Sequence, residues 1–198
     1  MKNLYSIIIP VFNEKLKIDI LLKNLEDYSC YGHEILVVDD GSTDGSKDIL
    51  LGCSFIKLIT YKSNKGKGNA IIKGLQASKN EKIVIFDGDL ELNPTEIRKL
   101  MILDTDKKIR FVIANRFNDH YATSIWDIGN KFLTAIFNLI HRSNVKDALC
   151  CAKSFYKPDI QIDTLKAKKF DIDVEITSKL AKLDPNIKNV NLKYERRT

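Results

Sequence analysis

The chain has 198 residues, of which 44% are hydrophobic and 29% are charged. This suffices for one domain with a substantial core, and it excludes a disordered or fibrous protein. No apolar run approaches the roughly 20 residues that span a bilayer, so we expect no membrane-spanning helix. Lys and Arg number 32 against 26 Asp and Glu, and the net charge of +6 favours phosphate-bearing partners such as nucleotides or anionic lipid surfaces. Because no basic run is interleaved with aromatic residues, a nucleic-acid partner is not expected.

The cysteines indicate a reducing compartment. The chain has four of them, without C-x-x-C spacing: Cys30, Cys53, Cys150 and Cys151. We expect free thiols and a cytoplasmic protein. The apolar run Tyr5–Phe12 is broken by Pro10 and has no small-residue cleavage site, so it is typical of a strand and not of a secretion signal.

The first half of the chain alternates apolar, β-branched runs with helical patterns. Apolar residues at i, i+3, i+4 and i+7 predict a helix through Ile18, Leu21, Leu22 and Leu25. Further helices are predicted over 43–51 and 68–78, and strands over 6–11, 34–38, 55–61 and 82–86. Buried strands that alternate with helices predict a parallel, doubly wound α/β sheet.

The second half continues with longer helices. We predict strands over 111–114, 149–156 and 190–194, a helix over 125–141, and a helix with Ile172, Ile176, Leu180 and Leu183 on one face. No Pro-, Gly- or Ser-rich linker divides the chain. We therefore expect one domain over 1–198, with a nucleotide-binding half, 1–94, and an acceptor-facing half, 95–198.

Acidic clusters follow the predicted strands. In open α/β sheets ligands bind beyond the carboxyl ends of the strands, so these clusters should meet there. Asp87 and Asp89 are two residues apart, and in extended backbone both carboxylates project to the same side. Gly88 leaves room for a ligand, and Glu91 could add a third oxygen. Such ligands suit Mg²⁺ or Mn²⁺, which bridge diphosphate oxygens, so the pattern favours a metal–nucleotide site.

Two other polar segments have both a functional and a structural interpretation. Asp39 and Asp40 end the second predicted strand and could accept hydrogen bonds from a base or ribose, whereas Asp40, Ser42 or Thr43 could instead cap the next helix. The glycine-punctuated segment 64–70 matches no phosphate-binding motif and could be a turn that enters a helix. Lys65 or Lys67 in that segment could still neutralise a diphosphate.

Taken together these segments resemble family-2 glycosyltransferases of the GT-A fold, and among them the dolichyl- and polyprenyl-phosphate sugar synthases. In the first half the similar segments are Ser6–Glu14, Val37–Asp44, Asn64–Ala70 and Phe86–Pro94. In the second half they are Ala114–Phe117, Gly129–Thr134, Asp147 with Lys153–Phe155, Phe170–Glu175, and Tyr194 with Arg197. The resemblance implies a single GT-A type domain whose mostly parallel central sheet is flanked by helices.

The resemblance also implies a function: metal-dependent, inverting transfer from a UDP- or GDP-sugar. It implies that the donor sugar nucleotide is bound by Pro10, Phe12, Asn13, Glu14, Asp39, Asp40, Gly41, Lys67, Gly68, Asp87 and Gly88. It assigns the Mg²⁺ or Mn²⁺ ion to Asp87, Asp89 and Glu91, and catalysis to Asp89, Asp147 and Arg116.

The acceptor stays open between two classes. A polyprenyl phosphate is the first choice and needs no strong base, whereas a glycan hydroxyl needs one, for which Asp147 is the candidate. Asp147 could equally orient a neighbour or cap a strand. A sugar nucleotidylyltransferase and a non-catalytic nucleotide-sugar-binding protein are the alternatives from other classes. The first should carry a glycine-rich turn after strand one, where this chain has Pro10–Asn13.

The predicted helix 125–141 is apolar around much of its circumference. We expect this surface to be buried in the core. The alternative is a peripheral membrane contact flanked by Trp126, Lys131 and Arg142. The three histidines, His33, His120 and His141, show no ligand-like spacing, so structural or surface roles are expected for them.

Overall fold

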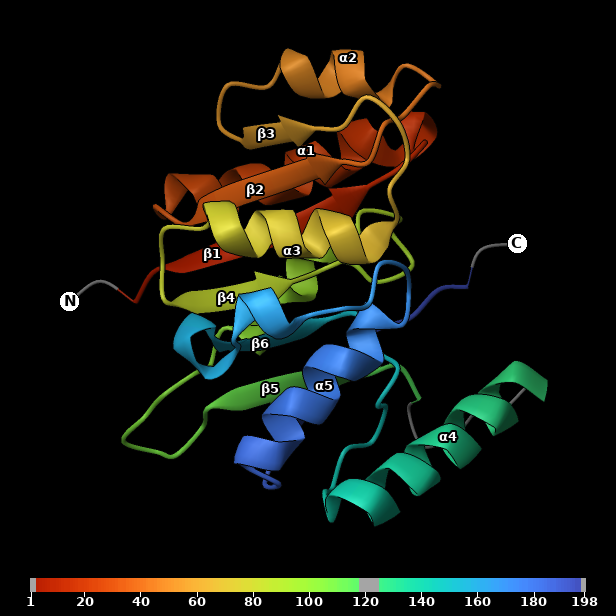
Figure 1. The fold of residues 1–198 in the computed structure, drawn as a ribbon. Helices are drawn as coiled ribbons and strands as arrows, with labels where there is room; N and C mark the ends of the chain where they lie inside the picture. Colours follow the sequence, from red (N-terminus) through yellow and green to blue (C-terminus); the bar gives the residue numbers. More distant parts are fainter. Residues whose placement is uncertain (1–2, 118–124, 197–198) are drawn as a thin grey trace.

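A computed structural model describes residues 3–117 and 125–196 of the chain (Figure 1). Three positions discussed above, His120, Arg197 and the side chain of Trp126, lie outside the described residues. The first half contains β1 (Tyr5–Val11), α1 (Lys15–Cys30), β2 (Glu34–Asp39), α2 (Ser46–Leu51), β3 (Lys57–Thr60), α3 (Lys67–Ala77) and β4 (Lys82–Ile85). The second half contains β5 (Phe111–Asn115), α4 (Ile125–His141), β6 (Lys153–Tyr156), α5 (Ile172–Leu183) and β7 (Lys188–Asn191). Short 3-10 helices cover Pro94–Leu100, Lys157–Asp159 and Ile162–Thr164.

The strands form one seven-stranded sheet in the order β3-β2-β1-β4-β6-β5-β7. The pairs β1–β2, β1–β4, β2–β3 and β5–β7 are parallel, whereas β6 runs antiparallel to both of its neighbours. The chain builds outward from β1 to β3 and returns to add β4 on the other side of β1. This confirms the predicted mostly parallel α/β sheet and places its switch point between β1 and β4.

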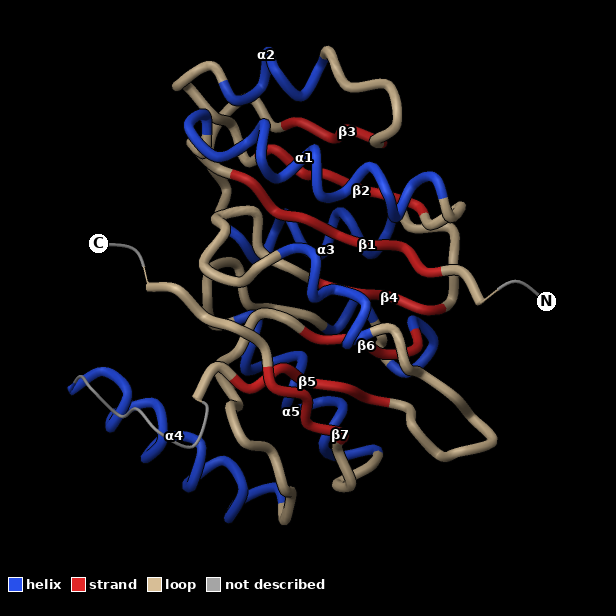
Figure 2. Tube along the Cα trace, turned by 180° about the vertical axis from the view of Figure 1, so that it is seen from behind, coloured by secondary structure: helices blue, strands red, loops and turns tan. Residues whose placement is uncertain are grey.

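Helices cover both faces of the sheet. In Figure 1, α3 and α5 lie in front of the strands and α1 lies behind them, a view reversed in Figure 2. Every residue of β1 and of β2 is buried, which explains their continuous apolar sequences, since a central parallel strand is covered on both faces. The outer strands β3 and β7 are only half-buried.

Several predicted boundaries shift for local reasons. The helix predicted over 43–51 begins only at Ser46, because Asp44 accepts hydrogen bonds from the backbone and side chain of Ser46 and Gly45 adopts a φ of +95°. The strand predicted over 190–194 is instead Lys188–Asn191, the stretch that pairs with β5. No helix in the described ranges is long and apolar enough to cross a membrane.

The expected core burial of α4 is wrong for most of its apolar residues. Phe137 is only 7% exposed and packs inward, but Phe132 is 66% and Leu139 is 81% exposed. The other exposed members of this surface are Ile128, Leu133, Ile136 and Ile140. Figure 1 shows the reason: α4 lies beyond the end of the sheet and only one side of it faces the body of the protein. Leu183, predicted on one face of the helix with Ile172, Ile176 and Leu180, is exposed although those three residues are buried, because it is the last residue of α5.

Candidate active site

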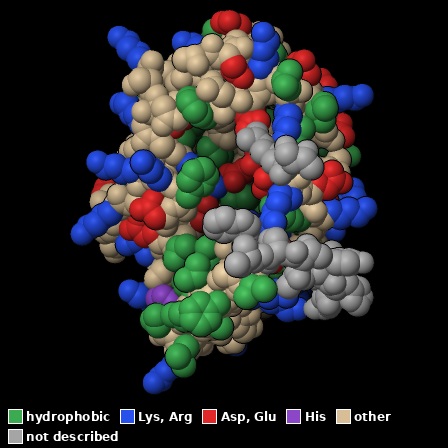
Figure 3. All heavy atoms as spheres, turned by 90° about the vertical axis from the view of Figure 1, so that its right-hand side faces the viewer, with side chains coloured by type: hydrophobic (Ala, Val, Ile, Leu, Met, Phe, Trp, Pro, Cys, Tyr) green, Lys and Arg blue, Asp and Glu red, His purple; other side chains and the backbone are tan. Residues whose placement is uncertain are grey.

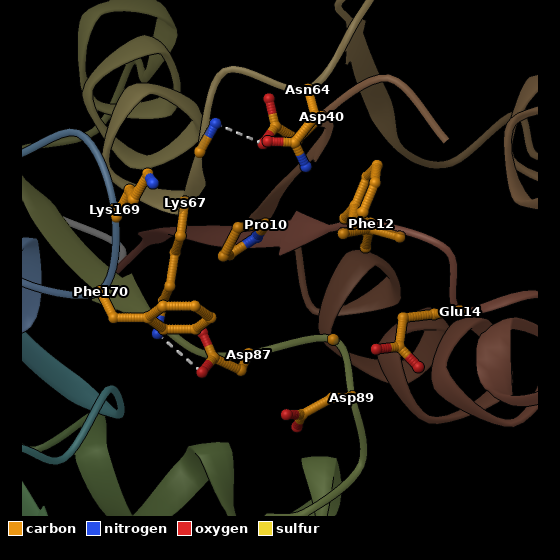
Figure 4. Close-up of a pocket in the computed structure, with 13 residues that line it drawn as sticks. Pro10, Phe12, Glu14, Asp40, Asn64, Lys67, Asp87, Asp89, Lys169 and Phe170 are labelled. Atoms are coloured by element: carbon orange, nitrogen blue, oxygen red, sulfur yellow. Dashed lines mark hydrogen bonds and ion pairs between the residues drawn. The ribbon is translucent and has the colours of Figure 1, made fainter. Parts of the chain in front are cut away.

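Two adjoining cavities lie where β1, β2 and β4 end. The first has a volume of about 390 Å³ and is lined by Pro10, Val11, Phe12, Glu14, Asp40, Asn64, Gly66, Lys67, Asp87, Gly88, Asp89, Lys169 and Phe170 (Figure 4). The second, of about 410 Å³, is lined by Lys67, Asp87, Asp89, Glu91, Leu92, Arg116, Asn130, Leu149, Cys151, Phe170, Asp173, Val174 and Tyr194. The two share Lys67, Asp87, Asp89 and Phe170. These shared residues form the boundary at which a group could pass from one cavity to the other.

A buried ion-pair network occupies this boundary. The Nζ atom of Lys67 lies 2.7 Å from Oδ2 of Asp87 and 2.8 Å from Oδ2 of Asp173. Burial raises the pKa of the Asp87 carboxyl, although Lys67 opposes the shift. Burial alone would lower the pKa of Lys67, but Asp87 and Asp173 outweigh it and hold that pKa well above its usual value. The second oxygens of Asp87 and Asp173 are buried without a hydrogen-bond partner.

The Asp87–Asp89 segment is a turn and not the extended backbone that was predicted. The strand β4 ends at Ile85, and the turn continues into Leu90 with a φ of +58°. Lys17 donates a hydrogen bond of 2.8 Å to the backbone oxygen of Asp89 and so anchors the turn. Despite the different backbone, both carboxylates line both cavities. Gly88 is required for packing as well, because a Cβ there would lie 2.8 Å from Cγ2 of Val11.

The carboxylates at the boundary fit a metal ion that arrives with a nucleotide. Mg²⁺ is usually bound through one or two carboxylates together with substrate phosphates. Asp87 and Asp89 supply two such groups, and the buried Oδ1 atom of Asp87 is an acceptor without a hydrogen-bond partner. Among the described residues no group of three or more His, Cys, Asp or Glu is arranged to hold a metal. The predicted trio that includes Glu91 is therefore not assembled, and Glu91 lines only the second of these two cavities.

The aspartates after β2 shape the first cavity. Asp40 accepts hydrogen bonds from the backbone N–H groups of Lys65 and Gly66, at 2.8 and 2.7 Å, so it holds the loop that leads into α3. Asp39 lines neither cavity; one of its oxygens accepts from Ser42, and the other is buried without a partner. The alternative interpretation as a helix cap does not hold, since α2 has no side-chain cap.

Three further residues predicted to bind the donor, Asn13, Gly41 and Gly68, line neither cavity. Asn13 joins two loops by hydrogen bonds to the segment after β2. Gly41 has a φ of +80°, and a Cβ there would lie 2.5 Å from the backbone of Ser63. A Cβ on Gly68 would lie 2.3 Å from the backbone oxygen of Ala167. These residues therefore support the loops around the first cavity: Asn13 does so by hydrogen bonds, and the two glycines by allowing close approach of neighbouring backbone.

Arg116 reaches the second cavity, and Asp147 holds it there. Nε of Arg116 lies 2.7 Å from Oδ2 of Asp147, and Nη2 lies 3.0 Å from Oδ1. Burial would lower the pKa of Arg116, but the hydrogen bonds and charge of Asp147 raise it above its ordinary value. Asp147 itself is fully buried and lines neither cavity. Of the roles considered for Asp147, the geometry fits orientation of a neighbour.

Sequence reasoning assigned no site role to several residues that the fold brings here. Lys169 and Phe170 come from the chain before α5, Asp173 from α5 itself, and Asn130 from α4. The Phe170 ring is 76% exposed and lies 5.6 Å from Nζ of Lys67, over the boundary between the cavities. The similarity noted at Phe170–Glu175 was the available signal, but it did not indicate which side chains would face the site.

Known proteins resemble this chain in sequence and in fold. Undecaprenyl-phosphate 4-deoxy-4-formamido-L-arabinose transferase of Pseudomonas paraeruginosa is 34% identical over 109 residues, which cover 50% of this chain and 32% of that protein. Dolichyl-phosphate beta-glucosyltransferase of Mus musculus is 29% identical over 109 residues, 48% of this chain and 34% of that protein. The chain thus spans about a third of the length of these curated relatives.

The crystal structure of glucosyl-3-phosphoglycerate synthase from Mycobacterium tuberculosis with Mn²⁺, UDP-glucose and phosphoglyceric acid shares the fold. It superposes with a TM-score of 0.75 at 19% identity, covering 98% of this chain and 72% of that one. The sequence model described as Glycosyl transferase family 2 matches residues 6–155, and the chain belongs to that family.

Proposed function

We propose that this protein transfers a sugar from a nucleotide-diphosphate sugar to a polyprenyl phosphate. The observation that carries the proposal is the pair of cavities that share Lys67, Asp87 and Asp89. The donor nucleotide occupies the first cavity and the acceptor enters the second, so that the diphosphate and the sugar meet at the shared boundary. The two lipid-phosphate glycosyltransferases among the relatives support this acceptor class.

The first cavity offers groups suited to a nucleotide. Phe12 and Asp40 lie toward the ends of β1 and β2, and Lys67 lies toward the boundary with Asp87 (Figure 4). The aromatic face of Phe12 can pack against a base, while Lys67 places a positive charge where the diphosphate must lie. The related structure that holds UDP-glucose and Mn²⁺ favours a UDP-sugar over a GDP-sugar.

Asp87 and Asp89 would hold a Mg²⁺ or Mn²⁺ ion together with the diphosphate. When bound, such an ion neutralises the leaving diphosphate as a Lewis acid. In the transfer itself, the acceptor oxygen forms a bond to the anomeric carbon while the bond from that carbon to the diphosphate oxygen breaks. Attack from the face opposite the leaving group inverts the configuration and releases the nucleoside diphosphate. Lys67 remains beside the diphosphate and stabilises its increased negative charge.

The second cavity suits an anionic acceptor. Arg116, fixed by Asp147, presents a guanidinium group that pairs with phosphate. A phosphate oxygen is already negatively charged, so it needs no strong base. Both oxygens of Asp147 are engaged by Arg116, and we therefore assign Asp147 a positioning role and not the role of a base.

A glycan hydroxyl is the second candidate acceptor, and one observation favours it. Asp173 lines the second cavity, and its Oδ1 atom is buried without a hydrogen-bond partner. That group could accept the proton of a hydroxyl acceptor, with Lys67 and Lys153 stabilising its charged form at 2.8 and 3.6 Å. In that case Asp173, and not Asp147, is the base.

The direct test combines nucleotide binding with transfer. Purified protein is titrated with UDP and GDP, with and without Mn²⁺, and release of UDP from UDP-sugars is measured with undecaprenyl phosphate or with a soluble glycan as acceptor. We expect UDP to bind only with the metal, and Asp89→Asn to reduce transfer by about 100-fold or more. Asp106→Asn, an exposed carboxylate that lines neither cavity, is the matched control and should retain full activity. Tight binding of UDP in EDTA, or equal transfer by Asp89→Asn, would contradict the proposal.

A further inference from the structure

The apolar surface of α4 faces away from the protein. Its exposed residues, defined above, are Ile128, Phe132, Leu133, Ile136, Leu139 and Ile140. At 3.6 residues per turn they occupy an arc of about 140° around the helix axis, whereas Asp127, Thr134 and Phe137 lie on the other side and are buried. The usual amphipathic arrangement is thus reversed, because a helix of a globular protein normally turns its apolar side inward.

The exposed charged side chains of α4 and of the residue that follows it are positive. Lys131 and Arg142 are both exposed: Lys131 lies beside the arc, with its Nζ atom 5.9 Å from the centroid of the Phe117 ring, and Arg142 directly follows the end of the helix. The one acidic residue of α4, Asp127, is buried and pairs with Arg196 at 2.8 Å. From Ile128 to Arg142 the helix and the residue that follows it carry no acidic side chain. An apolar face with a basic edge and no acid is suited to a surface that is apolar inside and anionic outside.

The helix that carries the apolar face also borders the acceptor side of the site through its inner side. Asn130 of α4 lines the second cavity, together with Arg116. Figure 3 views the molecule from the right-hand side of Figure 1: a hydrophobic patch lies over α4 in the lower part, and acidic side chains lie around a hollow above it. The apolar face and the opening of the site therefore look out in the same direction.

We infer that the apolar face of α4 lies in the surface layer of an anionic lipid bilayer, with Lys131 and Arg142 at the level of the headgroups. This inference rests on the proposed function, since it brings the second cavity to the membrane that carries a polyprenyl phosphate. Interfacial helices bind in this way through buried apolar area and attraction to anionic lipids. A second copy of the chain fits less well, because a two-fold contact would bring the basic edges together without an acid on α4 to offset them.

Vesicle flotation tests the inference. The protein is mixed with vesicles of phosphatidylcholine alone or with 30% phosphatidylglycerol, and the bound fraction is measured. We expect binding to the anionic vesicles, reduced about tenfold or more by the double variant Leu139→Asp/Ile140→Asp. The matched control is Leu16→Asp/Leu51→Asp, which alters apolar residues of α1 and α2 that are 95% and 63% exposed and should bind normally. Lys131→Gln and Arg142→Gln should each weaken binding to the anionic vesicles by about fivefold.

The same samples separate this inference from the proposed function. Binding of UDP with Mn²⁺ is measured on each variant, and α4 lies outside the donor cavity, so Leu139→Asp/Ile140→Asp should bind UDP as the wild type does. Wild-type protein that binds UDP but does not float with anionic vesicles overturns the membrane inference alone. Equal loss of flotation in the Leu16/Leu51 control also overturns it, as does a dimer in solution that only the α4 variant disperses. Flotation that depends on α4 without any UDP binding would support the membrane surface and refute the transferase proposal.

Discussion

Asp147→Asn tests whether the buried carboxylate positions Arg116 or acts as a base. The amide keeps one acceptor but turns a donor toward the guanidinium, so one of the two contacts at 2.7 and 3.0 Å is lost and Arg116 keeps its charge without a counter-ion. Removing one partner of a buried ion pair costs about 3–5 kcal/mol. The Arg116 side chain is 17% exposed, so we expect the lower end of that range, about 3 kcal/mol.

For a chain of this length, that loss lowers Tm by about 6–12 °C, measured by differential scanning calorimetry. Lys107→Met is the control: it removes an exposed pair with Asp104, which solvent screens, and it should leave Tm nearly unchanged. If Asp147→Asn unfolds within about 2 °C of the wild type, the positioning argument is refuted. Should turnover then vanish together with the acidic limb of the pH profile, Asp147 is the base after all.

Two other predictions concern the fold. Gly74→Ala places a Cβ 2.5 Å from Cγ2 of buried Ile8, so it should destabilise the protein by about 1–3 kcal/mol in denaturant titrations, despite the better helix propensity of alanine. Gly129→Ala, which meets nothing within 4 Å, should instead stabilise by up to about 1 kcal/mol, and equal effects would contradict the steric argument. Burial lowers the pKa of His33, whose Nδ1 accepts the Tyr5 N–H at 3.2 Å. The unfolded chain therefore takes up a proton at a higher pH than the folded one, and stability should fall as pH drops below about 6.5. His33→Asn keeps an acceptor that does not titrate, so its Tm should decline less between pH 7 and pH 5; an identical decline would exclude His33 as the cause.

The sequence predicted the central strands well, because these strands are buried on both faces of the sheet. The strands predicted over 6–11 and 34–38 correspond to β1 and β2, because continuous β-branched runs are typical of central parallel strands. Outer strands were predicted less well. The strand expected over 55–61 shortens to Lys57–Thr60, the four residues that pair with Leu36–Asp39 of β2. Length at an edge depends on the neighbouring strand, which the local sequence does not contain.

The sequence predicted several of the residues that form the site, but not which of them form ion pairs with one another. Asp87 and Asp89 could be singled out from their position after a strand, whereas the glycine-punctuated segment 64–70 offered Lys65 or Lys67 without a choice between them. The structure places Asp87, Asp89 and Lys67 at the cavity boundary. That Lys67 also binds Asp173, 106 residues later, depends on the packing of α5 beside α3. Likewise, periodicity shows that the helix 125–141 has a wide apolar surface, but it does not show whether another element covers it.

The two outermost strands bear on how the protein behaves at high concentration. Each consists of four residues, begins with lysine, and is half-buried: β3 at one end of the sheet and β7 at the other. A long, flat outer strand offers unpaired backbone groups on which further chains can add and grow into fibrils. Strands this short can form few hydrogen bonds with an incoming chain. The lysine at the start of each strand would also repel the same lysine of a second copy. Aggregation of this protein should therefore begin from contacts other than sheet extension.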